Sequence, residues 1–121
     1  MNINYIELRG EKHPLCYNLY AIERICDEFG DIEAMSKMVS SDKQTDQIRA
    51  VSKLLKILME GGREYCREMG MELPKEVKNP SALIDIASPE TIKAVFGAIN
   101  GNSARTVEAT SKNAEATRGE A

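Results

Sequence analysis

The segment from Asp46 to Met69 constrains the fold more than any other part of the chain. Its apolar residues recur in alternating steps of three and four, at Ile48, Val51, Leu55, Leu58, Tyr65 and Met69, with Gly62 in the same register. This spacing places them on one face of an amphipathic helix of about six turns. Gly70, directly after this segment, is a stop signal. The face is widened to roughly 140° by three further apolar residues, Leu54, Met59 and Cys66. Because so broad an apolar face is unstable in water, we expect other parts of the chain to cover it.

Three residues of this helix depart from the pattern. Gly61 and Gly62 each cost about 1 kcal/mol relative to Ala inside a helix. They predict a kink, a close approach of another backbone or a tolerated weak point. Ile57 lies nearly opposite the apolar face, among charged residues, and is expected at the surface. An exposed isoleucine is ordinary on a protein, and it can also contact a partner.

The composition is typical of one globular domain that does not bind nucleic acid. The chain has 121 residues, of which 42% are hydrophobic and 29% charged, which suffices for a single modest core. Its net charge is -3 and it has no domain-sized basic patch. Since affinity for nucleic acid depends largely on lysine and arginine at the phosphates, this class of partner is not expected.

The cysteines and the apolar pattern predict a cytoplasmic protein with free thiols. The cysteines are odd in number and widely spaced, at Cys16, Cys26 and Cys66. They form no CxxC pair, which argues against zinc and thioredoxin-type sites. The sequence shows no signal segment and no run of 18 apolar residues, so no membrane contact is expected.

The beginning of the chain predicts a short β-hairpin. Apolar and polar residues roughly alternate over residues 3–9, so that Tyr5 and Ile6 point to opposite faces. Gly10-Glu11 is the expected two-residue turn, because type II′ turns prefer glycine at their first position. Pro14 has no N–H to donate and therefore limits the returning strand to an edge position.

Two short helices are expected next. Asn18 can cap the first helix by accepting a hydrogen bond in its first turn, and Gly30 supplies a left-handed stop. Asp31 can cap the second helix, which carries Met35 and Met38 on its apolar side. Because methionine side chains are flexible, these two can either fill the core or make adaptable contacts with a partner.

A last helix is expected to begin at Ser88-Pro89, since serine caps helices and proline favours their first position. Gly101 is the expected stop. Beyond it, over residues 102–121, only Val107 is large and apolar. Such a segment cannot bury enough surface to offset its chain entropy.

These signals together predict a mainly α fold. A short N-terminal β-hairpin precedes a small helical bundle organised around one long amphipathic helix, and a disordered C-terminal tail follows. The predicted domain covers residues 1–100, and the polar flexible tail covers residues 101–121. We find no internal repeat.

The sequence predicts no catalytic, cofactor-binding or metal-binding residues. His13 is the only histidine, and it is expected to be an exposed strand residue rather than a general base. A pair with Cys16 would need a perturbed thiol pKa, which nothing nearby in the sequence suggests. Five carboxylates lack the spacing of a calcium loop and are expected on a solvated helix face: Glu23, Asp27, Glu28, Asp31 and Glu33. We therefore expect a binding protein rather than an enzyme.

The order of the motifs resembles a known family. The hairpin ends in Gly10-Glu11-Lys12-His13-Pro14-Leu15-Cys16-Tyr17-Asn18-Leu19-Tyr20-Ala21-Ile22 and runs directly into a helix. It is followed by Cys26-Asp27-Glu28-Phe29-Gly30-Asp31-Ile32, then by Leu54-Leu55-Lys56-Ile57-Leu58-Met59-Glu60-Gly61-Gly62, and then by Pro74. Over roughly residues 3–100 this order resembles the tail assembly chaperones of long-tailed bacteriophages and prophages, in their Gram-positive branch.

The resemblance implies a non-enzymatic assembly factor, made in the cytoplasm of the bacterial host and absent from the mature virion. Such proteins coat the tape measure protein, a long and largely helical chain, and keep it soluble until tail tube proteins displace them. Many are also made in a longer form by ribosomal frameshifting, and the polar tail fits the place where two forms would diverge. The candidate partner-binding residues are Ile57, Gly61, Gly62, Met35 and Met38.

We also hypothesise weak self-association into open or helical homo-oligomers, through apolar helix surface or the hairpin edge. Two other classes of function stay open. One is a small protein–protein adaptor or transcriptional regulator of a mobile element, and a regulator would need a basic recognition helix. The other is a small enzyme that uses Cys16 or Cys66, which a thiol-reactivity assay would reveal.

Overall fold

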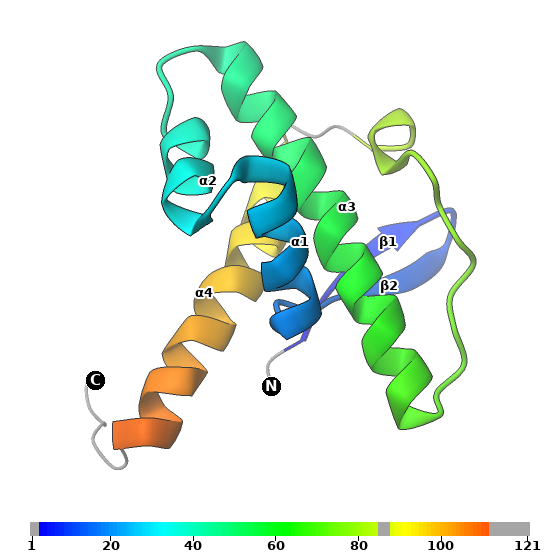
Figure 1. Cartoon of the computed structure of the whole chain (residues 1–121). Helices are drawn as coiled ribbons and strands as arrows, with labels where there is room; N and C mark the ends of the chain where they lie inside the picture. Colours follow the sequence, from blue (N-terminus) through cyan, green and yellow to red (C-terminus); the bar gives the residue numbers. More distant parts are fainter. Residues whose placement is uncertain (1–2, 85–87, 112–121) are drawn as a thin grey trace.

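The computed structural model describes residues 3–84 and 88–111, with side chains as far as Gly101. The elements follow one another as β1 (Asn4–Leu8), β2 (Glu11–Leu15), α1 (Leu19–Phe29), α2 (Ile32–Val39), α3 (Gln44–Met69), the 3₁₀ turn η1 (Pro80–Ala82) and α4 (Pro89–Ser111) (Figure 1). The predicted mainly α fold, with a short N-terminal hairpin and one long helix, is confirmed. None of the helices in the described part of the chain combines the length and apolar character needed to cross a membrane.

The turn of the hairpin differs from the prediction by one residue. Leu8 pairs with Glu11, so the two turn residues are Arg9 and Gly10 rather than Gly10 and Glu11. Their φ angles are 54° and 77°, and two consecutive positive φ angles define a type I′ turn. This turn matches the right-handed twist of the flanking strands, which outweighs the cost of placing an arginine at positive φ.

The hairpin has one face toward the core and one toward solvent. Leu8, His13 and Leu15 share the inner face and are buried. His13 was expected to be exposed, and that prediction is wrong. The inner position follows from the pairing of His13 with Ile6, which places both residues on the side that the helices cover.

The outer edge of β2 is closed by the backbone of α3. The N–H of Cys16 donates to the carbonyl oxygen of Leu58 over 3.1 Å. A Cβ atom added at Gly61 would lie 2.6 Å from the carbonyl oxygen of Cys16, and one at Gly62 would overlap the carbonyl oxygen of Pro14. The two glycines therefore permit a close approach of strand and helix, which is one of the three interpretations of the sequence. The helix stays continuous through them.

The local signals for α1 and α2 are confirmed. The Asn18 side chain accepts from the N–H of Ala21 at 3.0 Å, and Asp31 accepts from the N–H of Ala34 at 2.7 Å. Gly30 ends α1 with a φ of 102°, and its N–H donates to the last turn. Asn18 also donates to the carbonyl oxygen of Gly61 at 3.1 Å, so the same side chain begins α1 and fastens it to α3.

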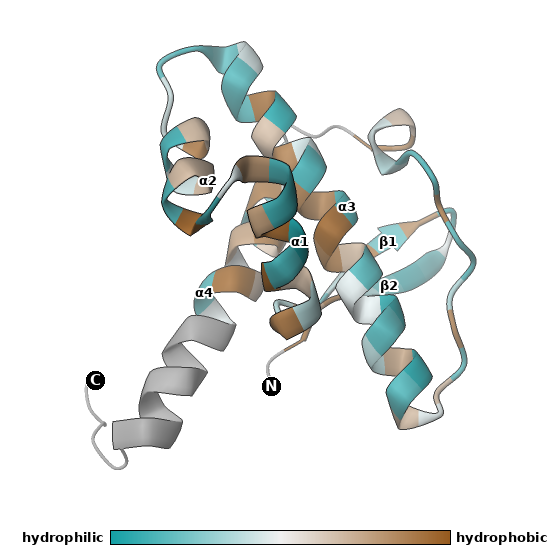
Figure 2. Ribbon diagram, viewed as in Figure 1, coloured by the Kyte–Doolittle hydropathy of each residue, from teal (hydrophilic) through white to brown (hydrophobic). Residues whose placement is uncertain are grey.

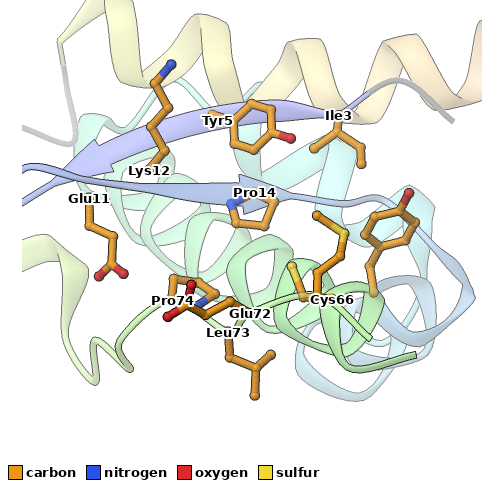
Figure 3. A pocket seen from close by; sticks show the side chains of 11 residues that line it. Ile3, Tyr5, Glu11, Lys12, Pro14, Cys66, Glu72, Leu73 and Pro74 are labelled. Carbon is orange, nitrogen blue, oxygen red and sulfur yellow. The ribbon is translucent and has the colours of Figure 1, made fainter. Parts of the chain in front are cut away.

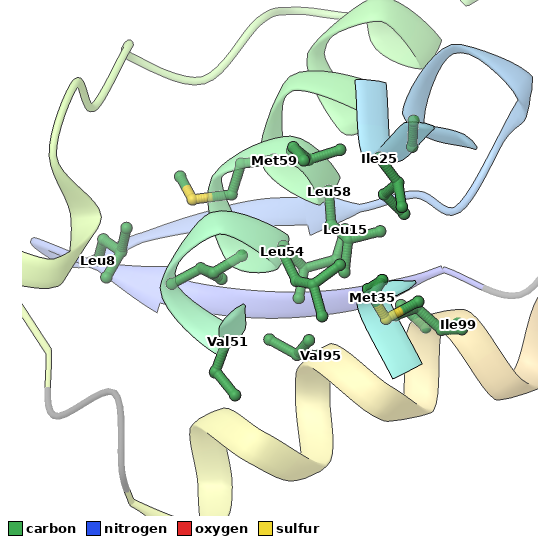
Figure 4. Packing of buried hydrophobic residues seen from close by; sticks show 14 residues of the cluster. Leu8, Leu15, Ile25, Met35, Val51, Leu54, Leu58, Met59, Val95 and Ile99 are labelled. Carbon is green, nitrogen blue, oxygen red and sulfur yellow. The ribbon is translucent and has the colours of Figure 1, made fainter. Parts of the chain in front are cut away.

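The core surrounds α3. Leu54, Leu55 and Leu58 are fully buried there, and the hairpin, α1, α2 and α4 pack around them. Figure 2 shows the apolar residues of α3 concentrated in the middle of the helix. Figure 4 shows side chains of every one of these elements meeting in a single cluster. The expectation that small elements cover the broad apolar face is confirmed.

The prediction that Ile57 lies at the surface is wrong. Ile57 is only 3% exposed, although its position opposite the apolar face predicted a surface residue. Gly61 lies one turn later on the same face and contacts the start of α1, so α1 covers this side of α3 as well.

Gly101 does not end the last helix. Helix α4 continues to Ser111, so the first part of the segment predicted as a flexible tail, residues 101–111, has a helical backbone. The rest of that predicted tail, residues 112–121, lies outside the described residues. A glycine lowers helix stability by about 1 kcal/mol without forbidding the conformation, and this explains why it is a weak stop signal.

Candidate binding surface

The residues predicted to bind a partner do not form a surface. Ile57, Gly61 and Gly62 are buried under α1 and β2. Met35 is buried beside Ile99 in the core (Figure 4). Met38 is partly buried on α2. In this conformation a partner cannot reach four of the five predicted residues.

Other apolar side chains are exposed to solvent. Within the described residues, the large exposed ones are Tyr5, Leu19, Tyr20, Ile48, Met69, Met71, Leu83 and Ile92. Two of them, Tyr5 and Met71, line one groove between the outer face of the hairpin and the end of α3 (Figure 3). Single exposed apolar residues are normal, whereas a group in a concave site suggests a binding surface.

We call this feature the tyrosine groove. Its volume is about 220 Å³. Its apolar lining consists of Ile3, Tyr5, Pro14, Tyr65, Met71 and Leu73. These residues come from four separate segments: β1 with the residue before it, β2, the last turns of α3 and the loop that follows α3.

The hairpin supplies one wall of the groove. Tyr5 and Pro14 are cross-strand partners, so both side chains project from the outer face. Figure 3 shows the two rings next to each other on this face. Tyr5 is 50% exposed whereas Pro14 is buried, because Pro14 also lies against Gly62 of α3.

The end of α3 and the following loop supply the other wall. Gly70 adopts a left-handed conformation with a φ of 69°, and the N–H of Met71 then donates to the carbonyl oxygen of Cys66 at 2.9 Å. This cap turns the chain back toward the hairpin. The guanidinium group of Arg63 donates to the carbonyl oxygen of Pro74, which fixes the loop against the helix.

Sequence reasoning missed the tyrosine groove for a physical reason. The alternation in the first strand did place Tyr5 on the opposite face from Ile6, and Gly70 did mark the end of the long helix. The meeting of these two elements depends on how the hairpin docks on α3. That docking is determined by Gly61 and Gly62, whose role the sequence left open.

The side chains of His13 and Cys16 lie in the interior. Burial is the main cause that lowers the pKa of His13, and Arg9 and Arg63 lower it further. Glu11 opposes this shift, since its carboxylate lies 4.0 Å from Nε2 of His13. Burial raises the pKa of the Cys16 thiol to about 11. At neutral pH this thiol stays protonated, which is the opposite of what a nucleophilic cysteine requires.

A second, polar crevice of about 400 Å³ lies between α1, α3 and residues 76–78. Arg24 crosses it and forms ion pairs with Glu28 at 3.8 Å and Glu60 at 3.3 Å. The carboxylates that the sequence placed on a solvated face of α1 and at the start of α2 are exposed. In the described ranges, no three His, Cys, Asp or Glu side chains are grouped so that they could hold a metal ion.

The three cysteines are free thiols, as the sequence predicted. Comparison of the chain with models of protein families, with curated proteins and with solved structures finds no match.

Proposed function

We propose that this protein is a non-enzymatic tail assembly chaperone of a bacteriophage or prophage, which binds the tape measure protein and keeps it soluble while the tail tube assembles. The proposal starts from the resemblance of residues 3–100 to that family. The observation that carries it further is the tyrosine groove, a concave site open to solvent and lined by both apolar and charged side chains. In the cytoplasm of the host such a surface would meet the partner before the virion is complete.

The chemistry of the exposed residues suits the holding of another chain. Tyrosine and methionine are enriched where proteins contact one another, and tyrosine provides large contact area at a small cost in conformational entropy. Methionine also adapts its shape to different partners. Tyr5 and Met71 supply both residue types in one groove, which favours a binding role over a purely structural one.

The competing functions find less support. A transcriptional regulator needs a basic helix free to enter a DNA groove, whereas α3 has ten buried residues and is covered by the hairpin and other helices. A thiol enzyme needs a reactive cysteine, whereas Cys16 is buried with a pKa raised to about 11. We therefore favour the chaperone.

Co-expression with the tape measure protein tests the proposal directly. We expect the soluble fraction of the tape measure chain to increase several-fold when this protein is present. An unrelated helical protein of similar size serves as the control for a general effect of co-expression. An equal soluble fraction with and without this protein would refute the proposal.

Self-association belongs to the same proposal and has its own measurement. We expect the sedimentation coefficient to increase with protein concentration. Strictly monomeric behaviour at high concentration would exclude open or helical oligomers while leaving the binding of the tape measure chain to be judged by co-expression.

A further inference from the structure

We infer that the tyrosine groove binds a helical segment of the partner in which a large aliphatic side chain lies beside a lysine or arginine. This inference rests on the proposed function, and it goes further by naming the binding site and the chemistry of the segment that occupies it. Two features of the groove lead to it, namely its apolar interior and its negatively charged end.

The interior is suited to an aliphatic side chain. Tyr5 is 50% and Met71 is 49% exposed, so each has about half of its surface left to cover. Pro14 and Tyr65 complete an apolar lining. The volume of about 220 Å³ is below the range of about 300–1,000 Å³ that is usual for organic ligands. A site of this size has room for one leucine, isoleucine or methionine side chain rather than for a whole organic ligand.

One end of the groove is negatively charged. Helix α3 ends there, at Met69, and the carboxyl end of a helix carries a partial negative charge. Glu72 lines the groove, and Glu68 lies one turn beyond Tyr65 on the same helix face. Neither glutamate forms an ion pair within the part of the chain that the structure describes.

The charged side chains that line the groove are unequal in number. Lys12 lies on the opposite wall and forms no ion pair within the described part of the chain either. The lining has two carboxylates, those of Glu11 and Glu72, against this one ammonium group. A cation next to the aliphatic anchor would complement the excess negative charge.

A helical segment can supply both groups. The apolar lining and Glu72 belong to the same small groove, so the anchor and the cation must be close neighbours on the segment that binds. On a helix, residues three or four positions apart are neighbours at about 5–6 Å. An amphipathic helix that places its anchors in an apolar groove is a common mode of recognition.

The test uses overlapping peptides of about 20 residues, the length of a moderately long helix, that together span the tape measure chain used in the co-expression experiment. Binding of each labelled peptide is measured by fluorescence anisotropy. We expect the bound peptides to carry an aliphatic residue and a lysine or arginine three or four positions apart. Replacement of that cation by glutamate should weaken binding by about tenfold and reduce its dependence on salt.

Variants of the protein locate the site. Met71→Glu places a charge in the groove and should weaken binding by at least about tenfold. Leu19→Glu is the matched control, because Leu19 is 72% exposed on α1 and lies outside the groove. Glu72→Lys should weaken the binding of the original peptides and strengthen the binding of peptides that have glutamate in place of the cation. Glu33→Lys, an exposed change on α2, should leave the binding of both kinds of peptide unchanged. Circular dichroism confirms that each variant is folded.

The outcomes separate the site from the function. If the protein solubilises the tape measure chain but Met71→Glu and Leu19→Glu bind its peptides equally, the groove is not the site and the chaperone role stands. The inference also fails if bound peptides prefer acidic residues, if no peptide binds, or if Met71→Glu abolishes self-association alone, which would make a second copy the occupant. Failure to solubilise the tape measure chain would refute the function itself.

Discussion

At the scale of single residues, Gly62 shows how one missing side chain permits the fold. Its Cα lies so close to β2 that an added methyl group would overlap the backbone of Pro14. We expect Gly62→Ala to lower the free energy of unfolding by about 1–3 kcal/mol. Because alanine stabilises the helix by about 1 kcal/mol relative to glycine, the strain between strand and helix exceeds this net loss by about that amount. Urea denaturation provides the measurement.

Gly97 offers a matched control on α4. A Cβ atom there would lie 2.5 Å from the side-chain nitrogen of Asn4, which is the end of a flexible side chain and can move. Gly97→Ala should therefore change the free energy of unfolding by less than about 1 kcal/mol, since the gain in helix propensity offsets the loss of the bond from Asn4 to Ala94. Equal destabilisation by the two substitutions would contradict the close-approach explanation.

His13 gives the protein a defined dependence on pH. Its pKa in the folded state is lowered from 6.5, mainly by burial, so the unfolded chain binds a proton more readily. The contribution of neutral His13 to the free energy of unfolding is complete above the pKa of His13 in the unfolded chain, and it is lost as the pH falls below 6.5. One such group changes the free energy of unfolding by at most about 1.4 kcal/mol per pH unit. We expect a lower melting temperature at pH 5.5 than at pH 7.5, two values on either side of the unfolded pKa.

The charges around His13 do not reverse this sign. Glu11 favours the protonated form, whereas Arg9 and Arg63 together with burial favour the neutral form. The variant His13→Gln should lose the part of the pH dependence that lies just below pH 6.5. A slope that is unchanged in the variant would show that other groups cause it.

At the scale of secondary-structure elements, the sequence predicted well what a few neighbouring residues determine. The caps at Asn18 and Asp31 and the helix stops at Gly30 and Gly70 are local features, and each is found at the expected residue. Only Gly70 adopts the left-handed α conformation that was expected of Gly30. The hairpin turn was misplaced by one residue because two turn types compete over the same glycine. The burial of Ile57 could not be predicted, since it depends on the path of α1 across α3.

Asn18 links a local signal to tertiary structure, and this can be measured. Asn18→Ala removes the cap of α1 and the hydrogen bond to Gly61. We expect a loss of about 1.5–3 kcal/mol in the free energy of unfolding. Asp31→Ala removes only an exposed cap and should cost about 1 kcal/mol. Equal losses in urea denaturation would indicate that the contact from Asn18 to α3 contributes nothing.

At the scale of the whole molecule, the tyrosine groove illustrates why the candidate site was beyond the sequence. Its walls come from segments that are separated along the chain by about fifty residues or more, such as Pro14 and Tyr65. Periodicity describes each wall separately and carries no information about their contact. Among the predicted partner-binding residues, Ile57, Gly61 and Gly62 were chosen because they interrupted the helical pattern. They interrupt it because they pack against other elements or permit their close approach.

Because the hairpin and the helices share one core, we expect them to unfold as one unit. A two-stranded hairpin is marginally stable alone, but Leu8 and Leu15 are buried in the same cluster as the helices. We expect the loss of helix, followed by circular dichroism, and the loss of hairpin structure, followed by the NMR signal of His13, to share one urea midpoint. Leu15→Ala should destabilise both by about 2–5 kcal/mol. An earlier midpoint for the hairpin alone would show instead that it can detach from α3, which would open the residues beneath it to a partner.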